Sequence, residues 1–342
     1  MNRNLNDLLQ PVEHAPLPSA QLGLRWSPIE PADGRQLLQL VEVCNDHDQS
    51  LESFSQNDIA DLLEEAREHI IQDVVVGRDS EGIIRAMGSV EVVVSRQTAA
   101  QATVNAFIHP QWRGRGVGRA LLRWQDARAR QIITGHYGPK AHVDVRVSNM
   151  VDAHLNDRRR LYMAAGFSPI RTFQTMYKDL TSGEPEVFGV PEGFQIVNWH
   201  GNTNDKVRAL HTRVFKDHWG SEVDAEAWWD DARRTMEKRW SYVAFSPEGE
   251  LAGYLLVSRH PAQWIRTGIR EAYAELLGVA PEFQGHGIAR ALLTHSIHAA
   301  WQSKMARYGL DVDKENAHGA MAFYERHGFV PAGARVFYSL DV

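Results

Sequence analysis

Hydrophobic and polar positions follow the same order of patterns twice along the chain. In each half, runs of alternating or continuous apolar residues, typical of strands, are separated by stretches with apolar residues three or four positions apart, typical of helices. The turn between two neighbouring strands contains Gly82 in the first half and Gly249, 167 positions later (249 − 82), in the second. A repeat of this length indicates a duplicated domain rather than a solenoid unit.

The predicted elements mix strands and helices in both halves. The first half predicts strands at 22–26, 73–76, 83–94, 102–108, 142–147 and 172–180, and helices at 31–43, at 57–69, from 117 onward and just before 161. The second half predicts strands at 194–199, 241–245, 251–258, 271–279, 309–311 and 336–340, and helices at 204–217, 224–239, 288–308 and 316–327. Each half therefore predicts one sheet with helices packed on it, an α+β arrangement.

A segment without helical or strand periodicity separates the two copies. Residues 183–192 are rich in proline and glycine, a composition typical of a linker. The sequence therefore predicts an N-terminal domain at 1–182, a linker at 183–192 and a C-terminal domain at 193–342.

Both copies contain a glycine-rich turn between a predicted strand and a predicted helix. The first contains Ile108, Arg113, Gly114, Arg115, Gly116, Val117, Gly118 and Arg119, and the second contains Val279, Gln284, Gly285, His286, Gly287, Ile288, Ala289 and Arg290. Glycine lets the backbone approach a ligand closely, and the first N–H groups of the following helix can bind an anion. The turns therefore predict a site suited to a pyrophosphate. Neither turn has the Gly-Lys-Ser/Thr of a Walker loop or the Gly-x-Gly-x-x-Gly of a dinucleotide loop.

Both turns fit the pattern Gln/Arg-x-x-Gly-x-Gly/Ala, which resembles the acetyl-CoA loop of the GNAT N-acetyltransferases. Two Tyr-x-x-x-Gly-Phe motifs, at Tyr162 and Tyr324, resemble the segment in which that family carries a general-acid tyrosine. The resemblance covers nearly the whole chain. It implies two tandem GNAT domains, each a mixed, mostly antiparallel sheet flanked by helices. It also implies acetyl-CoA as the co-substrate, bound by the residues of the two turns and by Asn316.

The resemblance implies direct transfer of an acetyl group to an amine, without an acyl-enzyme. The thioester carbonyl then needs a hydrogen-bond donor, the amine must lose a proton to a carboxylate or a water, and the leaving thiolate needs a proton. Tyr324 is the candidate acid, and Tyr162 holds the matching position in the first copy. A ring packed in the core with its hydroxyl in water remains the alternative for both tyrosines.

Aligning the two turns, at an offset of 171 (284 − 113), matches Glu275 in the second copy with Val104 in the first. Glu275 lies four residues before Val279, so on a regular strand the two side chains share a face. Valine cannot take a proton, so the second copy alone has a candidate base and is predicted to be the catalytic one. A plain ion pair remains the alternative for Glu275.

The stretch 219–240 combines acidic and tryptophan residues, among them Trp219, Glu222 and Asp224. In the GNAT family this region walls the acceptor site. These residues are therefore candidate substrate contacts, because carboxylates and aromatic rings suit a cationic amine. An amphipathic helix with its charges in solvent is the alternative.

Composition further restricts the expected partners and the expected location of the protein. The 342 residues carry a net charge of −6, which does not favour a nucleic-acid partner. Cys44 is the only cysteine, the N-terminus lacks a signal-like segment, and no apolar run could span a bilayer, so we expect a cytoplasmic protein without membrane contact. The histidines lack the carboxylate or cysteine partners of a metal site, so no metal is expected.

The sequence therefore predicts a tandem-domain N-acetyltransferase acting on a primary amine of a small molecule, such as an amino sugar, an aminocyclitol or a polyamine. The segment 214–220 is also similar to actinobacterial tandem members of the family, a group that includes mycothiol synthase. Two alternatives stay open: acetylation of a cysteinyl amino sugar, as in that group, and a non-catalytic acyl-CoA sensor. The sequence leaves open whether the protein is a monomer or a homodimer.

Overall fold

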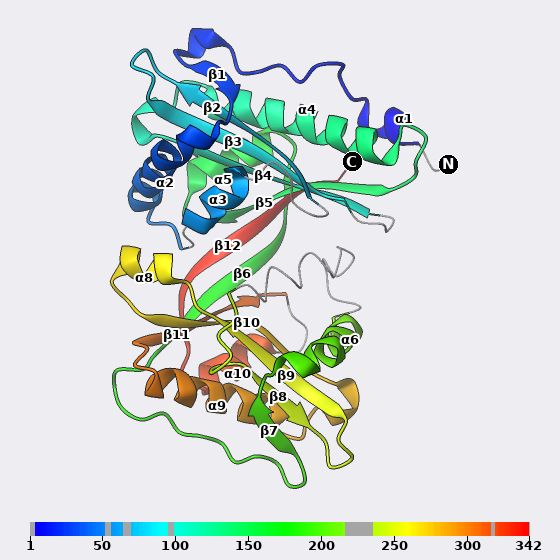
Figure 1. The fold of residues 1–342 in the computed structure, drawn as a ribbon, viewed down its shortest axis with the longest axis vertical. Helices are drawn as coiled ribbons and strands as arrows, with labels where there is room; N and C mark the ends of the chain where they lie inside the picture. The colour runs from blue at the N-terminus through cyan, green and yellow to red at the C-terminus, as the bar shows by residue number, and fades with distance from the viewer. Residues whose placement is uncertain are drawn as a thin grey trace. The chain divides into compact units, whose positions relative to one another are not determined.

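The computed structural model describes residues 4–51, 56–63, 70–94, 99–215, 235–315 and 319–341. The chain divides into two compact units, whose elements are labelled in Figure 1. The first unit contains Met1–Thr172 and Ala334–Val342, and the second contains Phe173–Gly333.

The first unit is built on a sheet with the strand order β1-β2-β3-β4-β5-β12. Neighbouring strands are antiparallel, except that β4 and β5 run parallel. The strands are β1 (Arg25–Pro28), β2 (Ile70–Arg78), β3 (Ile84–Val93), β4 (Ala99–Ile108), β5 (Asp144–Asp152) and the end of β12 (Val330–Asp341). The helices are α1 (Leu5–Leu9), α2 (Gly34–Asp48), α3 (Gln56–Leu63), α4 (Val117–Tyr137) and α5 (Asn156–Ala164).

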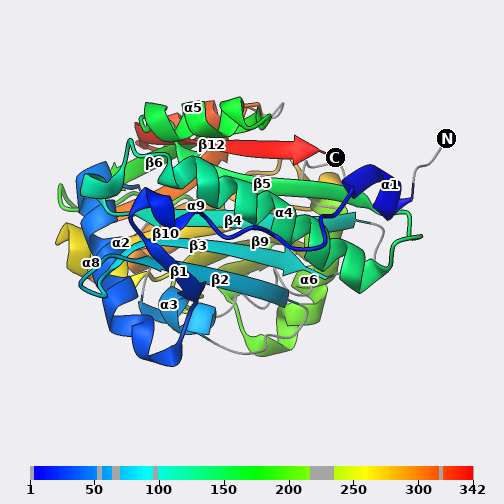
Figure 2. The ribbon, with the colours of Figure 1, turned by 90° about the horizontal axis from the view of Figure 1, so that it is seen from above.

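Helices cover both faces of this sheet. α4 packs on β3 and β4, as the view from above in Figure 2 shows. A Cβ atom at Gly88 of β3 would lie 2.7 Å from Cδ2 of the buried Leu121, so glycine lets α4 lie close to the sheet. On the other face, Leu37 and Val41 of α2 pack in a separate buried cluster with Val76 of β2. Burying each such side chain contributes about 1.5–3 kcal/mol, which fixes the strands between the two helical layers.

The second unit has the strand order β7-β8-β9-β10-β11-β6. Its neighbouring strands are antiparallel, except that β10 and β11 run parallel. The strands are β6 (Ser168–Asp179), β7 (Gln195–Asn198), β8 (Tyr242–Phe245), β9 (Leu251–Ser258), β10 (Glu271–Val279) and β11 (Arg307–Asp313). The helices are α6 (Asn204–Val214), α8 (Pro261–Thr267), α9 (Ile288–Gln302) and α10 (Ala320–Arg326).

Each unit takes one edge of its sheet from the other half of the sequence. β6 follows α5 of the first half, yet from Phe173 onward it pairs antiparallel with β11 of the second unit. β12 ends the second half, yet from Arg335 onward it pairs antiparallel with β5 of the first unit. The structure thus divides the chain at 172 and 333, whereas the sequence predicted a boundary at 183–192. Strand partners so distant in sequence leave no trace in local composition, which explains the difference.

Most predicted elements are present with shifted ends. β10 covers the predicted residues Glu271–Val279. The helix predicted at 288–308 is shorter in the structure, where α9 ends at Gln302. Lys304, with φ of +61°, then leads the chain toward β11. α8 was missed, although Pro261 at its start is a recognised helix-start signal.

The helix predicted at 224–239 is not formed in its described part, residues 235–239. Met236 instead makes a β-bridge to Ser258, and the backbone N–H of Glu237 donates to the carbonyl of Val257 at 2.8 Å. Pairing with the last residues of β9, beyond its pairing with β8, therefore replaces helical hydrogen bonds in this segment.

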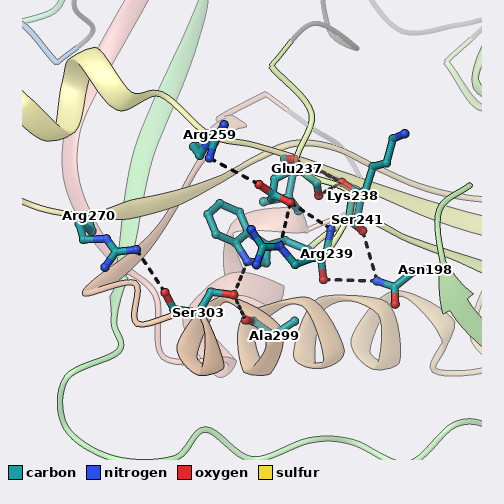
Figure 3. A network of polar contacts seen from close by, with 11 residues as sticks. Asn198, Glu237, Lys238, Arg239, Ser241, Arg259, Arg270, Ala299 and Ser303 are labelled. Carbon is teal, nitrogen blue, oxygen red and sulfur yellow. Dashed lines mark hydrogen bonds and ion pairs between the residues drawn. The ribbon is translucent and has the colours of Figure 1, made fainter.

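A polar network holds the same segment in place (Figure 3). The Ser241 hydroxyl donates to the carbonyl of Glu237 at 3.0 Å, and the Asn198 amide donates to the carbonyl of Lys238 at 3.2 Å. The indole N–H of Trp240 donates to Ser303 Oγ at 2.9 Å. The network ties the segment to β7, to β9 and to the end of α9, so the chain that follows residue 234 is fixed on the sheet.

Candidate active site

The two glycine turns share one backbone conformation. Gly114 and Gly116 have φ of +73° and +88°, and Gly285 and Gly287 have φ of +79° and +83°. These left-handed values favour glycine over any residue with a Cβ. α4 and α9 begin directly after Gly116 and Gly287 and receive no side-chain cap. The first N–H groups of both helices therefore remain available to an anion.

The first residue of each motif closes the turn. Arg113 Nε donates to the carbonyl of Ile108 at 2.9 Å, and Gln284 Nε2 lies 3.5 Å from the carbonyl of Val279. Both carbonyls belong to the last residue of the preceding strand. The structure thus gives these two side chains contacts within the turn, and it leaves the backbone N–H groups as the candidate anion-binding groups.

The other side chains of the two turns are divided between core and surface. Val117 and Ile288 are buried, so they can present only their backbone to a ligand. The guanidinium of Arg290 lies 4.0 Å from the ring centroid of Phe188, a residue of the predicted linker. The remaining turn residues are at least partly exposed: Gly118, Ala289, His286, Arg115 and Arg119.

In both units the parallel strands diverge beside the turn. The pairs of β10 with β11 end at Ala274↔Leu310, and the pairs of β4 with β5 end at Thr103↔Ser148. All four strands continue beyond these pairs. The N–H and C=O groups on the diverging edges can therefore hydrogen-bond to an extended ligand lying between the strands, and a strand N–H can serve as the donor to a thioester oxygen.

In the first unit, protein side chains fill the start of this gap. The amide of Asn149 on β5 donates both to the carbonyl of Val104 on β4 and to the hydroxyl of Tyr162. Tyr162 is buried, and its ring stacks on Tyr338 at 5.9 Å and meets Phe167 edge-on. Burial raises its pKa to about 12, against the effect of the Asn149 hydrogen bond. Tyr162 is thus a packed core residue with an engaged hydroxyl.

Tyr324 of the second unit is placed differently. It is half-buried on α10 and meets Phe323 and Phe329 edge-on. No hydrogen bond to its hydroxyl comes from the described part of the chain, and burial alone raises its pKa to about 12. The position that matches Asn149 is Asp311, whose carboxylate accepts a hydrogen bond from Thr175 Oγ1 at 2.7 Å. The asparagine that engages Tyr162 therefore has no amide equivalent beside Tyr324.

Glu275 lies at a β-bulge of β10. The register with β9 shifts between Ala274 and Leu276, which leaves Glu275 as the extra residue. The alternation used to place it on the face of Val279 is interrupted at this residue, so spacing alone does not set its direction. The direction of the Glu275 side chain is shown by its contact, since the exposed carboxylate lies 2.9 Å from Nε2 of His260. The sequence did not point to His260, since fifteen residues separate it from its partner.

An internal ion-pair cluster occupies the first unit near its glycine turn. The buried carboxylate of Asp48, at the end of α2, accepts hydrogen bonds from Arg113 at 2.5 and 3.0 Å and from Arg158 at 2.8 Å. The same groups line a pocket of about 510 Å³ together with His154. The cluster connects the glycine turn after β4 to α5 through the end of α2, so the Arg113 side chain is already engaged by Asp48.

Four predicted site residues lie outside the described residues: Trp219, Glu222, Asp224 and Asn316. Within the part of the chain that the structure describes, no cluster of three or more histidine, cysteine, aspartate or glutamate side chains could hold a metal ion. Within the same residues, no helix is long and apolar enough to cross a membrane.

Each unit thus combines a glycine turn at a helix start, which suits an anion, with two parallel strands that diverge beside it. Family models agree in both units. The model described as "Acetyltransferase (GNAT) domain" matches residues 71–169, and that of the "Acetyltransferase (GNAT) family" matches residues 204–329. The chain belongs to the GNAT acetyltransferase family and carries two of its domains in tandem.

Similar proteins match over most of the chain. The mycothiol acetyltransferase of Salinispora tropica is 30% identical over 251 residues, which are 69% of this chain and 72% of that protein. The mycothiol acetyltransferase of Salinispora arenicola is 26% identical over 329 residues, 92% of this chain and 95% of that protein.

Solved structures share the fold at lower identity. A GCN5-related N-acetyltransferase from Sphaerobacter thermophilus has a TM-score of 0.73 and 21% identity, covering 95% of this chain and 97% of its own. A tandem GNAT protein from the clavulanic acid biosynthesis pathway has a TM-score of 0.68 and 20% identity, covering 93% of this chain and 98% of its own. The tandem arrangement inferred from the repeated turns is thus confirmed.

Proposed function

We propose that this protein transfers the acetyl group of acetyl-CoA to a primary amine of a small molecule, and that the second unit performs the reaction. The observation that carries this assignment is the contrast between the two tyrosines. The hydroxyl of Tyr162 is buried and hydrogen-bonded to Asn149, whereas that of Tyr324 has no such partner among the described residues. A proton donor must be able to reach the reacting atoms, and Tyr324 meets that requirement better.

Each chemical requirement has a candidate in the second unit. The N–H groups that follow Gly287 would bind the phosphates of CoA, and an N–H on the diverging edge of β10 would donate to the thioester oxygen. Glu275 would accept the proton that the ammonium group must lose. Tyr324 would donate its proton to the departing thiolate, and its raised pKa keeps the phenol protonated at neutral pH.

The first unit would support the reaction without performing it. The residue that matches Glu275 is Val104, which cannot accept a proton, and Asn149 spans the gap between β4 and β5. The glycine turn around Gly116 keeps the geometry of an anion site, so CoA binding to this unit remains part of the proposal.

The acceptor is a cationic small amine in this proposal. The acidic and aromatic stretch that contains Trp219, Glu222 and Asp224 supplies the motivation, because carboxylates and rings attract ammonium groups. A second candidate acceptor is the amine of a cysteinyl amino sugar. The similarity to mycothiol acetyltransferases over 92% of the chain favours including it.

The test is turnover with a panel of amines. The purified chain is incubated with acetyl-CoA and an amino sugar, an aminocyclitol, a polyamine or a cysteinyl amino sugar, and released CoA and acetylated product are measured together. We expect one class to give product in proportion to CoA. Binding of acetyl-CoA without acetylation of any amine in the panel would contradict the proposal and support a sensor.

A further inference from the structure

The second unit contains a histidine–glutamate pair, of which the proposed chemistry involves only the glutamate. Nε2 of His260 lies 2.9 Å from Oε1 of Glu275, within hydrogen-bond distance. The two side chains keep 39% and 30% of their surface exposed, so they are accessible to water and to a substrate. The pair joins the residue at the bulge of β10 to the segment between β9 and α8.

The surroundings restrict the histidine ring. His260 directly precedes Pro261, which starts α8, and it follows β9 by two residues. Its ring meets that of Tyr273 at 6.0 Å with an interplanar angle of 77°. A glutamate has three rotatable side-chain bonds, whereas a histidine has two; the following proline restricts the backbone of this histidine, and its ring meets a neighbouring ring. The histidine is therefore able to fix the carboxylate.

The first unit has neither the histidine–glutamate pair nor the bulge. The hairpin glycines set the first and second copies 167 positions apart in this hairpin (249 − 82), and the glycine turns set them 171 positions apart (284 − 113). Val93 (260 − 167) therefore holds the position of His260 in the first unit, and Val104 (275 − 171) holds that of Glu275. The register of β3 with β4 runs without a shift from Gln101 to Ile108. Bulge, glutamate and histidine therefore occur as one set, in the unit assigned to the chemistry.

We propose that His260 is a positioning residue, which donates a hydrogen bond to Glu275 and holds its carboxylate toward the acceptor amine. This inference rests on the proposed role of Glu275 as the base. In the step concerned, an N–H bond of the ammonium group breaks and the proton passes to the free oxygen of Glu275. The other oxygen keeps its bond to His260, and the proton later leaves to water. A base misplaced by about 1 Å can cost on the order of 100-fold in rate.

The experiment is a double-mutant cycle in kcat with acetyl-CoA and the panel amine that is turned over fastest. The variants are His260→Ala, His260→Gln, Glu275→Gln and the double variant His260→Ala/Glu275→Gln. His298→Ala serves as the matched control, because His298 makes a comparable 3.0 Å pair with Glu184 from the outer part of α9. Thermal melting of each variant reports its folding.

We expect His260→Ala to lower kcat about 10–100-fold with little change in KM, since positioning acts on the reacting geometry. His260→Gln should recover most of the loss, because its amide can still donate. The double variant should be no slower than Glu275→Gln, because the histidine acts through the glutamate. His298→Ala should match wild type.

Three outcomes would overturn the inference. One is a wild-type kcat for His260→Ala while Glu275→Gln is slow, which leaves the proposed base intact and removes only the histidine. Another is multiplicative losses in the double variant, which would show that His260 acts apart from Glu275. A third is a wild-type kcat for Glu275→Gln, which would remove the proposed base itself and the positioning role with it.

Discussion

Replacing Asp48 by asparagine tests how the first unit is held together at its glycine turn. The Asp48 side chain is 3% exposed, and its carboxylate accepts hydrogen bonds from both Arg113 and Arg158. Asparagine keeps the shape of the side chain but removes the negative charge. It leaves two guanidinium groups side by side, with an amide NH₂ group beside them.

The expected loss of folding stability depends on how deeply the aspartate and the two arginines of this ion pair are buried. Removing one partner of a buried ion pair costs about 3–5 kcal/mol, because the remaining charge is left uncompensated. The side chains of Arg113 and Arg158 are 31% and 30% exposed, so water can rehydrate them in part. We therefore expect the lower end, about 3 kcal/mol. At roughly 2–4 °C per kcal/mol for a unit of this size, the melting temperature should fall by about 6–12 °C.

The assay is calorimetric or circular-dichroism melting at neutral pH, with urea unfolding as a second measure. The control is Glu282→Gln, which breaks the ion pair with Arg213 at 2.9 Å between side chains that are 46% and 52% exposed. Water screens such a pair, so its loss should leave the melting temperature nearly unchanged. Equal small shifts for both variants would refute the reasoning, because burial would then not decide the strength of the Asp48 pair.

Three further results are expected. Calorimetric titration with CoA should show that Gly287→Glu loses one of two binding sites. The double variant Gly287→Glu/Gly116→Glu should have no site left. An unchanged stoichiometry in the double variant would contradict the proposal that both glycine turns bind CoA. Neutralising the three acidic residues at 222, 224 and 226 should raise KM for a cationic amine and weaken its salt dependence, with kcat little changed; unchanged kinetics would make the stretch a solvated segment. Burial raises the pKa of both Tyr162 and Tyr324 to about 12, from an ordinary value of 10. Their contribution to the free energy of unfolding is therefore complete below pH 10 and is lost as the pH rises from 10 to 12. If both tyrosines ionised near pH 10 without unfolding, as seen by tyrosinate absorbance, this prediction would be refuted.

Local patterns predicted the parts of the fold that local physics determines. The strand Glu271–Val279 has the predicted ends, and both glycine turns have the left-handed conformations that their residues favour. The repeat also led to the tandem arrangement. These features depend on backbone preference and periodicity within a few residues, which a single sequence contains.

The remaining features depend on contacts between distant residues. β6 pairs with β11 and β12 pairs with β5, and neither choice could be read from composition. The distinction between the two tyrosines is set by Asn149, thirteen residues before Tyr162, and becomes visible only when β5 and α5 are placed side by side. The bulge at Glu275 likewise depends on the register with β9. Such features follow from strand pairing, for which periodicity supplies no rule.

The most direct test of the central claim compares Tyr324→Phe with Tyr162→Phe in kcat, using the fastest amine of the panel. Phenylalanine removes only the hydroxyl, so both rings keep their packing. We expect Tyr324→Phe to lower kcat by about 10²–10⁴, the usual contribution of a general acid, with CoA binding unchanged. Tyr162→Phe should stay close to wild type. Loss of turnover in Tyr162→Phe together with near-normal turnover in Tyr324→Phe would show that the first unit performs the reaction.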